Sequence, residues 1–256
     1  MSTTTENRSE FMTIPTLGVL GGMGPAATAD FLVKLARRTP AERDQDHLRT
    51  VVYSDPTTPD RSDAILGKGE SPLSAMLTGL KFLEKSGVDL IAIPCNTAHY
   101  WYDELAAATT VPIVHMVEAV NTQINVEAPR VRAVGLLATE GTVASGIYHE
   151  VLGGLGRVVM TRDGSEEQNP VMAGIRAVKA GEMPTARRFL MSAIHDLVQK
   201  GAAGVIYGCT DVSAALDQPP EGLPVPAWDA ADALAAACVD RLVTARMATI
   251  EVRGVS

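Results

Sequence analysis

The sequence predicts an α/β protein made of two similar three-layer domains with mainly parallel sheets, related by a pseudo-twofold axis. Two observations predict this fold. Short runs rich in Val, Ile and Leu alternate with segments of helical periodicity, as expected for parallel strands buried on both faces. In addition, the second half of the chain repeats the pattern of the first half.

The predicted strands are the short apolar runs in this alternation. They cover residues 16–20, 50–54, 90–94, 112–116, 133–137, 157–161 and 204–207, with a further short piece near Val225. Between them lie helices, and the clearest has Leu and Met at 3.6-residue spacing from residue 73 to 83. Ser71 is its expected N-cap, Pro72 its first helical residue and Gly87 its stop signal.

Two pairs of matching segments indicate the repeat. Residues 18–24 match residues 135–141 at an offset of 117, and residues 83–95 match 197–209 at an offset of 114. We infer a duplication, and we predict a flexible tail at 1–13, a first domain of 14–116 plus 228–256, and a second domain of 117–227. Because open α/β sheets bind ligands at the carboxyl ends of their strands, the predicted active site is the cleft between the domains.

Composition restricts the class of partner. The chain has 256 residues, 46% of them hydrophobic, and a net charge of −8 without a Lys/Arg cluster, which argues against nucleic acid and membrane surfaces. No apolar run approaches the roughly 20 residues that span a bilayer, and the polar start is unlike a signal peptide. Three cysteines without metal-ligand spacing fit a cytoplasmic, thiol-reduced protein with no metal site.

The duplication places Cys95 and Cys209 at equivalent positions, each at the end of an apolar strand and before a predicted helix start. Backbone N–H groups and the helix dipole there favour a thiolate. Two opposed thiols suit the removal of a proton from one face of a carbon acid and its return to the other face, without a cofactor. A buried structural role is the alternative, and it is the one we expect for Cys238. A redox disulfide normally uses a close C-x-x-C pair, which is absent.

Three further features are ambiguous alone. The turn Gly21–Pro25 lacks the third glycine of a dinucleotide fingerprint, so it is expected to bind a carboxylate or to serve only as a tight turn. Arg61 follows the second strand and could bind a carboxylate, or it is a solvated surface residue. Lys179 could do the same, or it stabilises the end of a helix.

Five separated blocks together carry a family resemblance: GVLGGMGPAAT at 18–28, PDR with ILGKGE at 59–70, PCNTAH at 94–99, LLATEGT at 136–142 and GCTDVS at 208–213. In these blocks the chain closely resembles the cofactor-independent aspartate racemases of the Asp/Glu racemase family. The resemblance implies that Cys95 and Cys209 are the acid/base pair, that no cofactor is used and that the protein is a homodimer. It further implies that Arg61 and Lys179 hold the side-chain carboxylate of a small amino-acid substrate. The remaining implied site residues are Met23, Gly24, Pro25, Asn96, Thr97, Thr139, Thr142 and Thr210.

The chain also departs from this pattern. Asp55 and Glu140 stand where such racemases commonly have Asn and a small polar residue, and Asp211 stands where they commonly have Glu. An extra carboxylate near a dianionic substrate would weaken its binding or shift the specificity. The predicted activity is racemisation of aspartate. The alternatives are a glutamate-preferring or broad-specificity racemase, a maleate isomerase-like enzyme and a non-catalytic amino-acid sensor. Two cysteines argue against the single-cysteine decarboxylases of the superfamily, and Arg61 with Lys179 favours a dicarboxylic amino acid.

Overall fold

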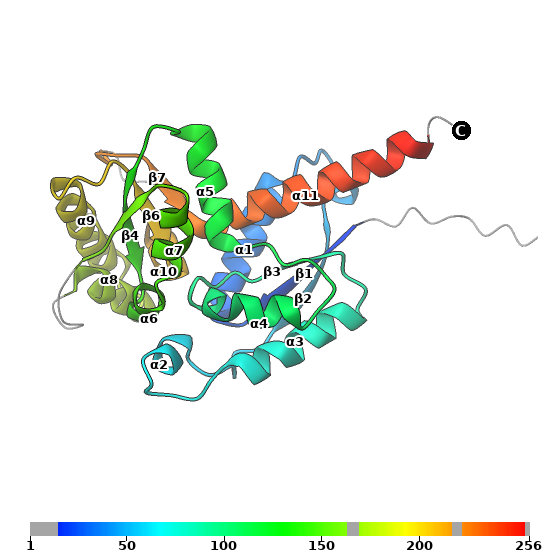
Figure 1. Ribbon diagram of the computed structural model, residues 1–256, viewed down its shortest axis with the longest axis horizontal. Coiled ribbons are helices and arrows are strands. Elements are labelled where there is room, and N and C mark those ends of the chain that lie inside the picture. The colour runs from blue at the N-terminus through cyan, green and yellow to red at the C-terminus, as the bar shows by residue number, and fades with distance from the viewer. Residues whose placement is uncertain (1–14, 163–168, 217–221, 254–256) are drawn as a thin grey trace, which may run out of the picture.

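The computed structural model describes residues 15–162, 169–216 and 222–253, so the predicted tail at 1–13 lies outside the described residues. Two parallel sheets form the framework (Figure 1). The first has the order β2 (Arg49–Ser54), β1 (Thr16–Gly21), β3 (Leu90–Ala92). The second has the order β5 (Val158–Met160), β4 (Ala133–Ala138), β6 (Val205–Gly208), β7 (Ala227–Asp229). The predicted mixed α/β class with parallel sheets is therefore confirmed.

Helices connect and cover these sheets. Those of the first half are α1 (Pro25–Arg38), α2 (Arg61–Ile65), α3 (Leu73–Lys85), α4 (Tyr102–Ala107) and the short 3₁₀ turns Asp44–Asp46 and Thr97–Trp101. Those of the second half are α5 (Met116–Glu127), α6 (Glu140–Ser145), α7 (Ile147–Gly154), α8 (Pro170–Lys179), α9 (Met183–Gln199), α10 (Thr210–Leu216) and the long α11 (Ala230–Arg253). Within the described residues, we find no helix with the length and apolar character that a membrane crossing requires.

The strands β1, β3, β4 and β6 are buried on both faces, and alternate residues along them enter different cores. On β1, Leu17 and Val19 face a central core that also contains residues of α1, α5, α7 and α11, whereas Leu20 faces the side covered by α3. On β6, Ile206 enters the same central core, and Val205 packs on the outer side with α8 and α9. This period of two is the geometry of strands buried on both faces, and it explains the continuous apolar runs.

The strand register supports the duplication inferred from the sequence. Gly18 on β1 pairs with Ile91 on β3, and Gly135 on β4 pairs with Val205 on β6. These are the residues that the offsets of 117 and 114 equate. The equivalent strands also face equivalent sides, because Leu136, like Val19, enters the central core. Equivalent strands therefore end at equivalent places in the two halves, and these ends include the ones that precede Cys95 and Cys209.

Three details of the predicted elements are wrong. Only Ile113 of the expected strand at 112–116 pairs, in an isolated parallel bridge with Ile91, because His115 caps α5 and the chain turns helical at Met116. The strand expected near Val225 lies at Ala227–Asp229. Helix α3 begins at Leu73, one residue later than expected, although the Ser71 hydroxyl still accepts a hydrogen bond from the Leu73 N–H at 3.3 Å.

Helix α11 links the two halves after the second sheet is complete. It packs against α1 and α5 and also contacts β3 (Figure 1). Strand β7 crosses the domain boundary that the sequence placed at residue 227, and it pairs with β6. We therefore propose that the second domain ends with β7 and that α11 is the segment returned to the first domain.

Candidate active site

A pocket of about 290 Å³ lies beyond the carboxyl ends of β1 and β3 in the first sheet and of β4 and β6 in the second. Its walls are the segments that follow β1, β3, β4 and β6, together with residues of the α2 and α8 regions. This volume suits a molecule of amino-acid size, well below a dinucleotide. A separate hollow of about 370 Å³ between α5 and α11 contains no cysteine, so we place the candidate chemistry in the first pocket.

All but one of the residues predicted for the site line this pocket. They are Met23, Gly24, Pro25, Arg61, Cys95, Asn96, Thr97, Thr139, Lys179, Cys209 and Thr210. The exception, Thr142, is buried one layer behind, where its hydroxyl bonds to those of Thr97 and Thr139 at 2.8 and 3.0 Å. The role of each residue toward a substrate stays a prediction.

The pocket also contains polar residues that the sequence did not assign to the site, namely Asp60, Ser62 and Asp211. The first two flank Arg61 in the PDRS segment, so the position of the arginine was the available signal. Asp211 was noted only as a departure from the family pattern. Its carboxylate lies 4.0 Å from the Cys209 sulfur, close enough to influence the protonation of that thiol.

Both thiols are nearly buried, with exposed fractions of 8% for Cys95 and 9% for Cys209. Burial raises the pKa of the Cys209 thiol to about 12, and the negative charge of Asp211 acts in the same direction. The backbone N–H groups of Asp211 and Val212 oppose this shift, as expected at a helix start. Cys209 is therefore a thiol at neutral pH, suited to donate a proton.

The two cations of the pocket differ in their surroundings. The Arg61 Nη1 donates to the carbonyls of Thr58 and Pro59 at 3.1 and 2.9 Å, which fixes the plane of the guanidinium. Its Nε is buried and has no hydrogen-bond partner among the described residues. Lys179, the last residue of α8, lies near Asp211, whose pKa is raised by burial and pulled back by the lysine. Arg61 is thus the better placed of the two to receive a carboxylate.

Hydroxyl groups join the two halves at one wall of the pocket. Thr97, which starts the 3₁₀ turn after Cys95, bonds to Thr139 at 3.2 Å, and Thr139 caps α6 by accepting from the Thr142 N–H. The α2 region closes on α6 beside them, because an added Cβ at Gly141 would lie 2.5 Å from the Ser62 Cα. Glycine at 141 is therefore required by this close approach.

The glycine turn after β1 is stabilised from within. Gly22 has φ +92°, and an added Cβ there would lie 2.3 Å from the Asp55 nitrogen. Its N–H donates to the Thr28 hydroxyl at 2.9 Å, and that hydroxyl donates to the Gly24 carbonyl at 3.1 Å. The turn therefore uses the Gly22 N–H for its own structure, while Met23, Gly24 and Pro25 are left to line the pocket.

Comparison with known proteins now decides the family. The family model described as Asp/Glu/Hydantoin racemase matches residues 20–238. The chain belongs to this racemase family. Among curated relatives, the broad specificity amino-acid racemase RacX of Bacillus subtilis is 35% identical over 213 residues, covering 82% of this chain and 91% of RacX. The predicted family membership is confirmed.

Solved structures agree. An aspartate racemase of Picrophilus torridus superimposes with a TM-score of 0.78 at 33% identity, covering 89% of this chain and 94% of that one. A glutamate racemase of Francisella tularensis shares the fold with a TM-score of 0.64 at 16% identity, covering 91% and 82% of the two chains. The predicted amino-acid racemase class is therefore supported.

In this racemase His99 fixes the backbone at Cys95 through a buried hydrogen bond. The Met116 N–H donates to the His99 Nε2 at 3.1 Å, so Nε2 is unprotonated and Nδ1 carries the hydrogen that reaches the Cys95 carbonyl at 2.9 Å. Burial, assisted by nearby His115, lowers the pKa of His99 to about 4. The ring is therefore neutral at physiological pH, and it ties the end of β3 to the start of α5.

We expect His99 to make stability fall in mild acid. An unfolded histidine titrates near 6.5, so between pH 6.5 and about 4 the unfolded chain gains a proton that folded His99 does not. The stabilising contribution of His99 to the free energy of unfolding is fully present above pH 6.5, and it falls by up to about 3 kcal/mol as the pH drops to 4. Urea unfolding from pH 4 to 8 measures this loss.

The His99→Gln variant identifies the residue responsible. We expect a flatter pH dependence in this variant, with a smaller residual slope from His115, whose pKa is also lowered by burial. The matched control is His195→Gln, because His195 is exposed on α9. An unchanged slope in His99→Gln would contradict the assignment.

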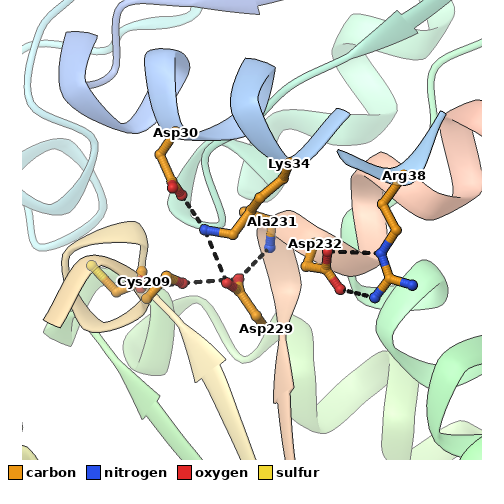
Figure 2. Close-up of polar contacts among 8 residues, drawn as sticks. Asp30, Lys34, Arg38, Cys209, Asp229, Ala231 and Asp232 are labelled. Atoms are coloured by element: carbon orange, nitrogen blue, oxygen red, sulfur yellow. Dashed lines mark hydrogen bonds and ion pairs between the residues drawn. The ribbon is translucent and has the colours of Figure 1, made fainter. Parts of the chain in front are cut away.

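A buried ion-pair network lies behind Cys209 (Figure 2). Lys34 of α1, only 4% exposed, pairs with Asp30 on the same helix and with Asp229 at 3.1 Å. Asp229 also accepts from the Ser213 hydroxyl and the Ala231 N–H, both at 2.8 Å. Ser213 follows Cys209 by one helical turn, and its N–H bonds to the Cys209 carbonyl at 3.1 Å.

This network connects α1, α10 and the start of α11. Burial alone would lower the pKa of Lys34, but the carboxylates of Asp229 and Asp30 raise it above its usual value. Burial raises the pKa of Asp229, and this effect is opposed by Lys34, Ser213 and Ala231. We expect both groups to be ionised at neutral pH because Asp229 receives three hydrogen bonds. The charge pair therefore fixes the Cys209 helix against α1.

Proposed function

We propose that this racemase interconverts L- and D-aspartate by proton transfer at the α-carbon, using Cys95 and Cys209 as acid and base and needing neither cofactor nor metal. The observation that carries the proposal is that two thiols from pseudo-equivalent strand ends line one pocket of amino-acid size. A sensor of amino acids would need neither thiol. The resemblance of the sequence to aspartate racemases also leads us to propose a homodimer, and light scattering of the purified protein tests this.

The proposed reaction consists of two proton transfers at the α-carbon. One sulfur, as thiolate, takes the α-proton, and the electron pair of the broken C–H bond stays on the α-carbon and spreads into the carboxylate. The opposite thiol then gives its proton to the other face of that carbon and becomes the thiolate. Each turnover therefore exchanges the protonation states of the two cysteines, and the reverse reaction uses them in opposite roles. We propose Cys209 as the resting thiol because burial and Asp211 keep it protonated.

The carbanion needs donors near the carboxylate that receives its charge. Asn96 Nδ2 and Arg61 Nε are both buried without protein partners in the described structure, and both residues line the pocket. Preorganised donors of this kind stabilise charge as it develops in the transition state. The charge develops on the α-carboxylate, for which we propose Asn96 as the donor, whereas Arg61, aided by Lys179, binds the side-chain carboxylate of aspartate and so orients the substrate.

A broader substrate range is the second candidate, and Asp211 favours it. Its carboxylate lines the pocket beside Lys179, so it opposes a second carboxylate on the substrate and tolerates an uncharged side chain. RacX, named as a broad specificity racemase, supports the same candidate.

A panel of substrates tests the proposed function and distinguishes the two candidates. Each enantiomer of aspartate, glutamate, methionine and homoserine is incubated with reduced protein and a chelator, without cofactor, and analysed by chiral chromatography.

We expect Asp211→Asn to shift this panel toward aspartate. Removing the negative charge relieves repulsion of the side-chain carboxylate, so kcat/KM for aspartate relative to homoserine should rise by roughly tenfold, the equivalent of about 1.4 kcal/mol. Glu140→Gln is the matched control, because Glu140 starts α6 without being among the residues that line the pocket. A ratio unchanged from the parent protein would exclude Asp211 as a determinant of specificity.

A further inference from the structure

The side-chain amide of Asn96 is only half satisfied. Asn96 is 3% exposed and lines the pocket directly after Cys95. Its Oδ1 accepts a hydrogen bond of 2.6 Å from the Tyr148 hydroxyl. Its Nδ2 is buried and has no hydrogen-bond partner among the described residues. A buried amide donor without a partner carries a desolvation cost, so this nitrogen is suited to an acceptor supplied by a ligand.

Tyr148 determines which end of the amide is left for that ligand. The ring lies on α7 in the second half of the chain and is 0% exposed. The Asn96 Oδ1 is the acceptor that the described structure provides for its hydroxyl hydrogen. If the amide were rotated by half a turn, Nδ2 would donate to the hydroxyl oxygen, and the hydroxyl hydrogen would lose its acceptor. Burial also raises the pKa of Tyr148, so the hydroxyl remains a donor.

We propose that Tyr148 is a positioning residue that fixes the Asn96 amide so that Nδ2 donates to a carboxylate oxygen of the substrate. Tyr148 is not among the residues that line the pocket, so it acts through Asn96. Because the two residues belong to different halves, the donor is set correctly only when the halves are assembled. This role rests on the proposed function, because it takes the substrate of that reaction as the carboxylate ligand.

A double-mutant cycle on ligand binding tests this proposal without catalysis. The probe is succinate, a dicarboxylate that has no stereocentre and so cannot be racemised, and its affinity is measured by titration calorimetry. Tyr148→Phe should weaken binding by roughly tenfold, because a donor that is no longer held in place loses part of a charge-assisted hydrogen bond. In the Asn96→Ala background the same substitution should have no further effect. Tyr102→Phe is the matched control, since its hydroxyl donates to the Ile113 carbonyl and Tyr102 does not line this pocket.

A measurement on the unaltered binding site covers the case in which Tyr148→Phe does not fold. The side-chain amide signals of Asn96 are assigned in nitrogen-15 spectra by their loss in Asn96→Asp. We expect them to shift when succinate is added to the wild-type protein. Additive losses in the cycle, an amide that does not respond to bound succinate, or no detectable binding of succinate would each overturn the proposal. A positive cycle in a protein that does not racemise aspartate would instead reject the proposed function and leave the role of Tyr148 intact.

Discussion

Replacing either Cys95 or Cys209 by Ala is expected to lower kcat for racemisation by on the order of 10²- to 10⁴-fold, the usual contribution of a positioned acid or base. Inversion needs one group on each face of the α-carbon, so loss of either thiol removes a complete half of the proposed reaction. The steady-state rate of conversion of L- to D-aspartate, followed by chiral chromatography, measures the effect. The fold should persist, because Cys→Ala removes a single sulfur from the wall of an existing pocket.

The third cysteine is the matched control for these variants. Cys238 is fully buried in α11 and contributes to the central core, away from the residues that line the pocket. Cys238→Ala should retain the parental kcat while losing some stability through the cavity it leaves. A Cys95→Ala or Cys209→Ala protein with the parental rate would reject the two-thiol mechanism.

Removing the cation of the buried pair should have the largest effect on stability. Lys34→Met leaves Asp229 and Asp30 without their common partner behind Cys209 (Figure 2), and breaking a buried pair in this way costs about 3–5 kcal/mol of unfolding free energy. Urea denaturation at pH 7 measures the loss. The double variant Lys34→Met with Asp229→Asn should recover part of it, because the uncompensated buried charge of Asp229 is removed as well.

An exposed ion pair between α1 and α11 is the matched control. Arg38 of α1 bonds to Asp232 at the start of α11, and the arginine side chain is 42% exposed, against 5% for that of Lys34. Arg38→Ala should therefore cost about 1 kcal/mol or less. Equal losses for Lys34→Met and Arg38→Ala would show that burial of the Lys34 pair contributes little.

The framework of the fold was predictable because it repeats. The offset between Gly18 and Gly135, and that between Ile91 and Val205, had already equated the residues that pair in the two sheets. Strands buried on both faces are continuous apolar runs, so they could be recognised in the sequence although polar and apolar residues do not alternate along them. The strand expected around Ile113 was wrong because an apolar run does not reveal that His115 caps a helix at this point.

The candidate pocket was predictable where its residues stand next to a strand end. Cys209 and Thr139 follow directly from β6 and β4, and Cys95 comes three residues after the end of β3, so position along the chain indicated them. The supporting residues gave no such signal. Lys34 lies mid-helix and Tyr148 in an unremarkable apolar segment, and each has a role only through a partner far away in sequence, Asp229 and Asn96 respectively. Long-range polar pairs of this kind become visible only once the chain is folded.

Deuterium exchange in the single-cysteine variants tests the two-base mechanism most directly. Each variant is incubated in D₂O with L-aspartate and, separately, with D-aspartate, and loss of the α-proton signal is followed by NMR beside chiral analysis. A lone thiol can remove and return a proton on one face only. We therefore predict that each variant exchanges the α-proton of one enantiomer without inverting it, and that Cys95→Ala and Cys209→Ala act on opposite enantiomers. Inversion by either variant at the wild-type rate, or exchange of both enantiomers by the same variant, would contradict the assignment of one thiol to each face.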